Sequence, residues 1–296
     1  MCENFIWYKI YKGRSAEIRK AAGLRGIIWN TKGANKMSKN VIFCYSGTGN
    51  CLDMAKNIAK VLGDTDIVMM RRAPAVVDVE DAERVGFVFP CYAGGLPGEV
   101  ERFVRSLKIA PEAYTFGVGQ FAGYPGNGLH IIDEIVGLDY WKSMSHQCGF
   151  IQSLPHNLMI PPMTAEMAEK RSQATAEKIG RDVLAKKEMV GRPREYKLNT
   201  LEYKAWPFLA EMKSHQFLVD PEKCIHCGQC VKICPKSNIT MIAETPCFGN
   251  DCYQCVSCLQ FCPTGAITMK GIGSRERYHN PNITAEELNK DVIHVD

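Results

Sequence analysis

Two cysteine runs near the C-terminus have the residue type and the spacing needed to hold metal clusters. Residues 224–235 read CIHCGQCVKICP and residues 252–263 read CYQCVSCLQFCP, so both are C-x2-C-x2-C-x3-C-P. Three thiolates at two-residue spacing can wrap around one cubane cluster, and the fourth ligand then comes from elsewhere in the chain. The proline after the last cysteine fixes φ and turns the chain away from the cluster. The doubled motif therefore predicts two 4Fe-4S clusters.

The ligands of the two clusters are expected to cross between the runs. In two-cluster ferredoxins, the fourth cysteine of each run ligates the other cluster. One cluster is accordingly assigned to Cys224, Cys227, Cys230 and Cys262, and the other to Cys252, Cys255, Cys258 and Cys234.

Other interpretations of these cysteines explain the pattern less well. Zinc sites usually pair two C-x2-C units across a longer loop, which differs from a doubled triple run ending in Cys-Pro. Cys247 makes the plant-type 2Fe-2S spacing with the start of the second run, but that assignment leaves Cys258 unexplained. His226 lies inside the first run, where four thiolates are already available, so we expect it to be a loop-surface residue.

The elements between residues 39 and 190 predict a doubly wound α/β sheet. Short apolar runs alternate with amphipathic segments, as in parallel sheets that are covered on both faces. Strands are expected over 41–45, 66–70, 84–90, 115–120 and 148–155, and helices over 50–62, 97–107, 127–138 and 164–187.

The loop after the first expected strand has the composition of a phosphate site. It reads SGTGN over residues 46–50 and leads into a helix. Two hydroxyls and two glycines before a helix N-terminus make a cradle of N–H groups for an anion. The lysine of a Walker A loop is missing, so a phosphate monoester fits better than a nucleoside triphosphate.

The segment YSGTGNCLDMAKNIA resembles the phosphate loop of flavodoxins, which bind FMN. The resemblance implies that Ser46, Gly47, Thr48, Gly49 and Asn50 contact the phosphate. Cys51 stands where that family commonly has a hydroxyl residue. The loss of one side-chain hydrogen bond there would weaken binding by about 1 kcal/mol without abolishing it.

The flavodoxin pattern also implies two loops around the flavin ring, at residues 90–98 and 120–128. Glycines let the backbone approach the ring edge, and aromatic side chains can cover its face. Cys91 is expected to pack near the ring without chemistry, because no activating base is evident. The ring-loop candidates are Pro90, Tyr92, Ala93, Gly94, Gly95, Gln120, Phe121, Gly123 and Tyr124.

The distribution of charge distinguishes the first 36 residues from the rest of the chain. Residues 1–36 carry eight Lys and Arg against two Asp and Glu, while the remainder is near neutral. No nucleic-acid module follows, so a flexible or misassigned start is favoured over a nucleic-acid-binding arm. The expected division is a poorly ordered basic extension at 1–38, an FMN domain at 39–190, a linker at 191–217, a cluster domain at 218–270 and a tail at 271–296.

The order of these motifs resembles the bacterial and archaeal flavodoxin-ferredoxin fusion proteins, and PHNLMIPP at 155–162 is a weaker match to the same family. The resemblance implies FMN, two clusters and electron transfer between a low-potential donor and a reductase acceptor, with no catalytic residue required. No second Rossmann unit for NAD(P)H is visible. No apolar run is long enough for a membrane span or a signal peptide, so a cytoplasmic protein is expected.

Two rival functions remain for this chain. One is an FMN-dependent reductase acting directly on a small organic or metal substrate, which needs a pocket above the flavin lined by residues such as Tyr92, His130 and His156. The other is a redox sensor that signals by cluster loss, but residues 271–296 are too short for an output domain.

Overall fold

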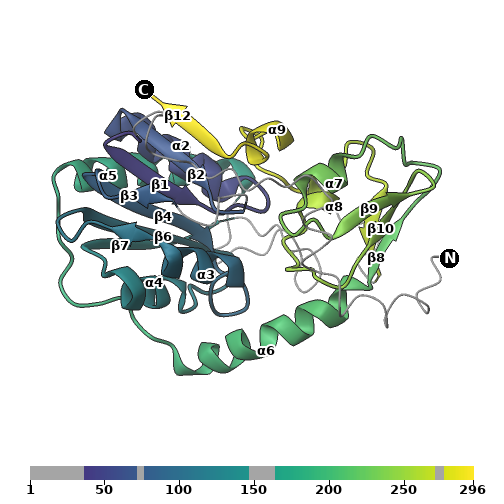
Figure 1. The fold of residues 1–296 in the computed structure, drawn as a ribbon, viewed down its shortest axis with the longest axis horizontal. Helices are drawn as coiled ribbons and strands as arrows, with labels where there is room; N and C mark the ends of the chain where they lie inside the picture. Colours follow the sequence, from purple (N-terminus) through teal and green to yellow (C-terminus); the bar gives the residue numbers. More distant parts are fainter. Residues whose placement is uncertain (1–36, 72–76, 147–163, 271–276) are drawn as a thin grey trace.

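The computed structural model describes residues 37–71, 77–146, 164–270 and 277–296. Two lobes lie side by side, a larger one built on a sheet and a smaller one that contains both cysteine runs (Figure 1). Helix α6 (Lys197–Ser214) runs along one side of the molecule from the larger lobe toward the smaller one.

The larger lobe is built on a six-stranded sheet in which five neighbouring strands are parallel. When the outermost strand β12 is left aside, the order is β2-β1-β4-β6-β7. This is the flavodoxin-like order 2-1-3-4-5, and its central strands are buried on both faces, which requires the continuous apolar runs seen in the sequence. The strands are β1 (Asn40–Cys44), β2 (Thr65–Met69), β4 (Arg84–Pro90), β6 (Tyr114–Phe121), β7 (Tyr140–Ser145) and β12 (Val292–Val295).

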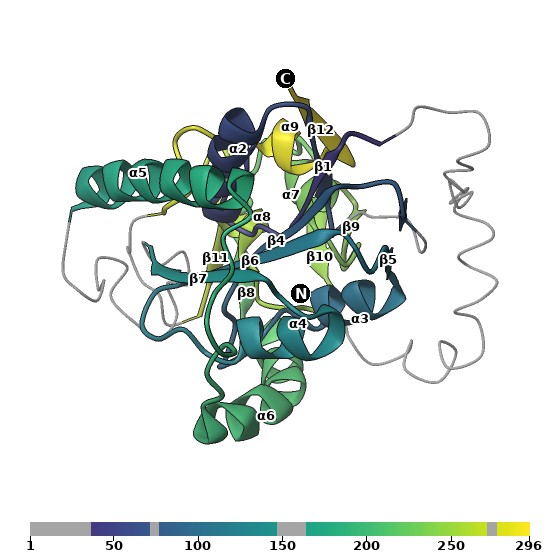
Figure 2. The ribbon, with the colours of Figure 1, turned by 90° about the vertical axis from the view of Figure 1, so that its left-hand side faces the viewer.

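Helices cover both faces of this sheet, so the predicted doubly wound α/β class is confirmed. Figure 2 shows α2 (Asn50–Leu62) and α5 (Ala165–Leu184) on one face, and α3 (Gly98–Ser106) and α4 (Gly128–Val136) on the other. The helix pair α2 and α5 packs closely because a glycine of α5 faces α2. A Cβ atom at that glycine, Gly180, would lie 2.6 Å from the side chain of Val61.

The C-terminal segment becomes part of the sheet. Strand β12 pairs antiparallel with β2, beyond a short helix α9 (Ala285–Leu288). Helix α9 begins with a capping box, in which Thr284 and Glu287 satisfy each other's backbone N–H groups. The sequence pattern predicts neither element, because both are only four residues long.

The smaller lobe is an α+β unit with an internal duplication. Each cysteine run leads into a short helix, α7 (Gln229–Ile233) or α8 (Ser257–Gln260), whose second residue is the third cysteine of that run. The lobe has two antiparallel strand pairs. These pairs join β8 (Phe217–Val219) with β11 (Ile267–Met269), and β9 (Ile239–Ile242) with β10 (Thr245–Phe248).

Several expected elements agree with the structure and others differ from it. The first four expected strands are found within one residue of their expected bounds. The expected strand at 148–155 and the segment 155–162 lie outside the described residues, and β7 occupies the sheet edge instead. The expected linker at 191–217 contains the five-turn helix α6. A separate two-stranded pair joins β3 (Asp78–Val79) to β5 (Lys108–Ile109).

Candidate functional site

A cavity of about 410 Å³ lies where the carboxyl ends of the central strands meet the smaller lobe. In open α/β sheets, ligands bind outside the carboxyl ends of the strands, where the strand order reverses, here between β1 and β4. The volume is within the range of small-molecule and cofactor sites. It is lined by Ser46, Gly47, Thr48, Asn50, Cys51, Pro90, Cys91, Tyr92, Ala93, Gln120, Phe121, Ala122, Gly123, Tyr124, His146, Glu202, Trp206, Gln254, Cys255 and Val256.

The loop between β1 and α2 forms one end of this cavity. Gly49 has a φ of 97°, which favours glycine, and its N–H donates to Ser46 Oγ at 3.1 Å. A Cβ atom at Gly47 would lie 2.6 Å from Tyr92 Oη and 2.7 Å from the carbonyl oxygen of Cys255, so no larger residue fits there. The loop therefore places backbone N–H groups at the start of α2, the arrangement that binds anions.

The loops after β4 and β6 form the sides of the cavity, but not every ring-loop candidate reaches it. Gly94 and Gly95 pack instead against α6, where added Cβ atoms would lie 2.8 Å from the Asn199 carbonyl oxygen and 2.3 Å from the ring of Tyr203, respectively. Gly49 also does not line the cavity. The other predicted flavin-site residues do.

Gln120 is a buried polar side chain in the wall of the cavity. It is 3% exposed and lines the cavity, and neither atom of its side-chain amide makes a hydrogen bond within the described part of the chain. An unsatisfied buried amide costs about 1–3 kcal/mol, and a ligand with polar ring edges would offset that cost. The cradle at one end and the orphaned amide along the side fit a phosphorylated, ring-bearing cofactor such as FMN.

Several residues of the cavity come from segments that the flavodoxin pattern does not include. Glu202 and Trp206 project from α6, and Tyr124 Oη donates a hydrogen bond to Glu202 Oε2. His146 follows β7, and burial together with the charge of Arg171 lowers its pKa to about 4, so its imidazole is neutral near pH 7.

Of the two histidines considered for a substrate pocket, His130 is not among the residues that line this cavity. His130 lies on α4, where its Nδ1 is 3.3 Å from the carbonyl oxygen of Pro193. His156 lies outside the described residues. Cys91 does line the cavity, but burial raises the pKa of its thiol to about 12, so it stays protonated near neutral pH.

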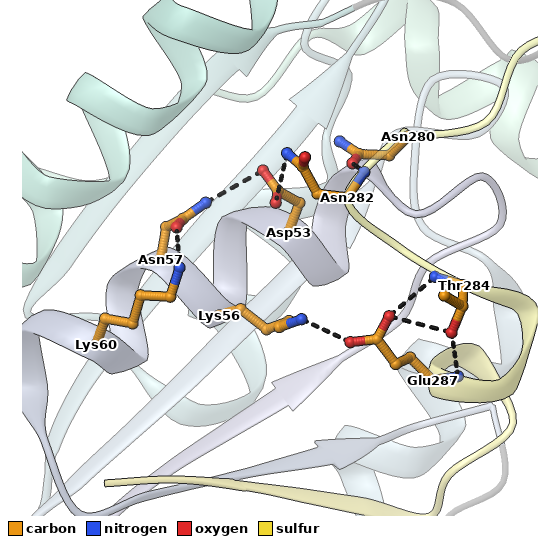
Figure 3. Close-up of polar contacts among 8 residues, drawn as sticks. All are labelled: Asp53, Lys56, Asn57, Lys60, Asn280, Asn282, Thr284 and Glu287. Carbon is orange, nitrogen blue, oxygen red and sulfur yellow. Dashed lines mark hydrogen bonds and ion pairs between the residues drawn. The ribbon is translucent and has the colours of Figure 1, made fainter.

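The C-terminal segment supports the anion-binding loop from outside. The N–H of Asn280 donates to the Thr48 carbonyl oxygen at 2.7 Å, and Tyr278 Oη donates to Asn50 Oδ1 at 2.8 Å. Figure 3 shows how this segment is fastened to α2, since Lys56 Nζ lies 2.6 Å from Glu287 Oε1. The segment thus fixes the position of the loop.

Two smaller cavities lie inside the smaller lobe, and each is lined by four cysteines. We call them the outer and the inner cysteine cavity. The outer one has Cys224, Cys227, Cys230 and Cys262, and the inner one has Cys234, Cys252, Cys255 and Cys258. These are the two crossed sets expected from the spacing, and the structure brings each set together.

The same backbone conformation occurs at equivalent places in both runs. His226 and Gly228 in the first run have φ values of 56° and 67°, and Gln254 and Val256 in the second have 58° and 52°. Left-handed φ is unfavourable for a β-branched residue, so Val256 is held there by its surroundings. The repeated turns place the three local cysteines of each run around the same cavity.

Two thiols of the inner cavity, those of Cys252 and Cys258, are held in the protonated form. Burial and the neighbouring thiols raise the pKa of Cys252 to about 12 and that of Cys258 well above its ordinary value. A bound metal centre deprotonates such thiols outright. The N–H groups of Asn238 and Gln254 donate to Cys234 Sγ and Cys252 Sγ, both at 3.3 Å, as expected around sulfur ligands.

The outer cavity lies nearer the surface than the inner one. Cys227 is exposed and Ile225 beside it is 60% exposed, whereas Cys255 and Cys258 are each 9% exposed. The side-chain amide nitrogen of Gln229, which lines the outer cavity, is buried without a partner among the described residues.

Arg71 joins the two lobes at the inner cavity. It is 5% exposed, and its guanidinium donates to the Ser46 carbonyl oxygen at 3.1 Å and to the Ile233 carbonyl oxygen. A second link between the lobes is the hydrogen bond from Ser257 Oγ to the Gly47 carbonyl oxygen, at 2.6 Å. Both links attach the anion-binding loop to segments that carry cysteines of the inner cavity.

Comparison with known proteins identifies part of the smaller lobe. A family model described as a 4Fe-4S binding domain (Fer4) matches residues 217–240, which include the first cysteine run. This region is therefore a 4Fe-4S binding domain. A search of curated proteins gave no match.

Three solved structures illustrate what about half of this chain is similar to. Rubredoxin oxygen:oxidoreductase from Desulfovibrio gigas is 15% identical over 51% of this chain and 37% of its own length, with a TM-score of 0.32. An FMN-dependent NADH-azoreductase from Bacillus anthracis is 7% identical over 48% of this chain and 97% of its own, with a TM-score of 0.33. NAD(P)H:quinone oxidoreductase from Methanothermobacter marburgensis is 10% identical over 50% of this chain and 98% of its own length, with a TM-score of 0.33.

Proposed function

We propose that this chain is an electron-transfer protein that passes electrons between two 4Fe-4S clusters and FMN and serves a partner redox enzyme. The outer and inner cysteine cavities would each hold one cluster, and the large cavity would hold FMN with its phosphate against residues 46–50. When bound, the clusters supply one-electron transfer and FMN supplies storage of two electrons taken up singly.

One observation carries this proposal: Cys255 and Val256 line both the inner cysteine cavity and the large cavity. With a cluster in the inner cavity and FMN in the large cavity, Cys255 would provide a path of bonded and packed atoms between the cluster and the flavin. Water is kept out of this wall, because Cys255 is 9% exposed and Val256 is 3% exposed.

The positions of the cysteine cavities also support a proposal for where the donor protein and the acceptor protein contact this chain. The outer cavity lies next to exposed residues, whereas the inner cavity shares Cys255 with the large cavity. We infer that a low-potential donor docks near Cys227 and that the reductase acceptor receives electrons from the flavin side. No helix in the described ranges has the length and apolarity to cross a bilayer.

The first test is the composition and the order of reduction of the anaerobically purified protein. We expect about eight iron and eight sulfide per chain, together with one FMN. Stopped-flow spectra with a low-potential donor should show bleaching of the clusters followed by reduction of the flavin. NADH or NADPH alone should reduce the flavin only slowly.

Each part of the proposal has its own contradicting result. About two iron per chain, or zinc in place of iron, would rule out the paired clusters. Recovery of FAD would rule out the monophosphate site. Rapid flavin reduction by NADH or NADPH without a donor protein would instead favour an enzyme that acts directly on a small substrate.

A second test examines the phosphate loop and the side wall of the large cavity with one variant each. Both Thr48→Val and Gln120→Leu should weaken FMN binding by about 1–2 kcal/mol, which is roughly a 5–30-fold rise in Kd, because each removes a polar partner of the ligand. Gln120→Leu should also stabilise the FMN-free chain, since it removes a buried amide that has no partner among the residues the structure describes. Fluorescence titration gives the Kd, and denaturant unfolding gives the stability.

The matched control is Thr240→Val, which changes an exposed threonine on β9 away from the cavity and should leave the FMN Kd unchanged. A Gln120→Leu chain that binds FMN as tightly as the original would show that this amide does not contact the cofactor.

A further inference from the structure

Helix α6 is apolar on two opposite faces, and among the residues that the structure describes only one of these faces is covered. Its inner face contributes Trp206 to the large cavity, and its Ala210 is 1% exposed. Tyr203 on the same face donates a hydrogen bond from Oη to Glu101 Oε2 at 2.7 Å. These contacts hold α6 against the larger lobe and leave the opposite face pointing outward along the edge of the molecule (Figure 1).

The outer face of α6 is a stripe of exposed apolar side chains. Successive members lie three or four residues apart, which is the heptad spacing of helices that pair with another helix. The large side chains are far more exposed than is usual for such residues, since Leu198 is 87%, Leu201 is 73% and Phe208 is 67% exposed. The stripe consists of Leu198, Leu201, Ala205, Phe208 and Met212, with Leu209 beside it.

We propose that this stripe binds the same stripe of a second copy of the chain, with the two α6 helices antiparallel about a two-fold axis. In this register Phe208 of each copy faces Ala205 of the other, so a large side chain meets a small one at the centre. Leu201 then faces Met212 on either side. A two-fold axis makes the contact self-complementary and closed, as in most soluble homodimers.

The charges that flank the stripe favour this occupant. In the antiparallel register, Lys204 lies beside Glu211 of the other copy, and the two-fold axis repeats the pair. Both side chains are exposed, and neither has an ion-pair or hydrogen-bond partner within the described chain. A membrane surface would instead favour a helix flanked mainly by Lys and Arg, whereas this helix carries Glu202 and Glu211 as well as its lysines.

A single helix pair is a small interface, so the dimer should dissociate on dilution into the micromolar range. We expect sedimentation equilibrium of the full-length, cofactor-loaded protein to show a monomer–dimer equilibrium. Lys204→Glu should raise the dimer Kd about tenfold, because it replaces two attractive pairs with two repulsive ones. The double variant Lys204→Glu/Glu211→Lys should restore the original Kd, and Leu201→Asp should raise it at least 100-fold.

Controls distinguish the loss of helix pairing from effects of net charge and of misfolding. Lys170→Glu makes the same change of net charge at an exposed site on α5 and should leave the Kd unchanged. Unchanged iron and flavin contents would show that each variant is folded. A monomer at all concentrations would overturn the proposal, as would a double variant no better than Lys204→Glu, or a monomer that binds anionic lipid vesicles through the stripe. This proposal does not depend on the electron-transfer function.

Discussion

Replacing Cys234 with serine should remove the cluster of the inner cavity, even though Cys234 belongs to the first cysteine run. The structure brings Cys234 together with Cys252, Cys255 and Cys258, which all belong to the second run. A serine hydroxyl is a poor ligand for iron compared with a thiolate. The variant should therefore keep about four of its eight iron atoms, and reduction of the flavin by a donor protein should fall by orders of magnitude, because the path through Cys255 is lost.

The complementary variant, Cys262→Ser, should remove the outer cluster and retain the inner one. EPR spectra of the two reduced variants distinguish the remaining clusters. Loss of the outer cluster in Cys234→Ser would show that each run binds its own cluster and would contradict the crossed arrangement. In Cys262→Ser, a small chemical reductant that reaches the inner site directly should still reduce the flavin.

Replacing Arg71 with methionine should lower the reduction potential of the inner cluster. Arg71 is buried, and in the described ranges no carboxylate forms an ion pair with it. A buried cation without a counter-ion is costly, so its presence favours an anion nearby. The charge of Arg71 acts on Cys234, where it is among the influences that oppose the rise in thiol pKa caused mainly by burial. A reduced 4Fe-4S centre with four thiolates, as proposed for the inner cavity, would be such an anion.

The size of the effect follows from Coulomb's law. Two unit charges about 8–16 Å apart interact by about 1–2 kcal/mol at an effective dielectric constant near 20, which corresponds to roughly 50–90 mV for a one-electron couple. Without the cation, the more negative reduced state is less stable, so the potential should fall by that amount. A redox titration of the anaerobically prepared protein, followed by EPR, measures the potential directly.

Arg71→Lys is the matched control, because it keeps the positive charge but loses the planar fork that bonds both lobes. Its inner-cluster potential should stay near the original value, while the contact between the lobes weakens. The outer cluster should be little affected in both variants. An unchanged inner potential in Arg71→Met, at full iron content, would show that Arg71 only joins the lobes.

The features that could be predicted from sequence are those that depend on local geometry. The cysteine spacing indicates both four-cysteine sets, because a cubane site requires three ligands from one tight loop and a fourth from a defined place in the duplicated run. The loop at 46–50 could also be predicted from local geometry, because glycines and hydroxyl residues directly before a helix are typical of an anion-binding site. The strands β1, β2, β4 and β6 follow from continuous apolar runs, which buried parallel strands require.

Other features depended on contacts between distant parts of the chain. Strand β12 and helix α9 are each four residues long and give no periodic signal, yet the segment that carries them supports the anion-binding loop through Asn280 and Tyr278. Helix α6 has apolar residues on opposite faces, so it lacks the single stripe that marks an amphipathic helix. Its two cavity residues, Glu202 and Trp206, therefore carry no recognisable motif.

The sequence by itself determined which residues are the candidates for holding clusters and a phosphate, and the tertiary structure decided how these candidate sites meet. Cys255 lines two cavities only because the smaller lobe docks on the loop at 46–50, where Ser257 and Gly47 are joined across 210 residues. Arg71 likewise acquires its position from carbonyl groups of both lobes. Local sequence patterns reflect the periodicity of a single helix or strand. The docking of the two lobes depends instead on the shapes and charges of two folded surfaces, and these do not follow from any local periodicity.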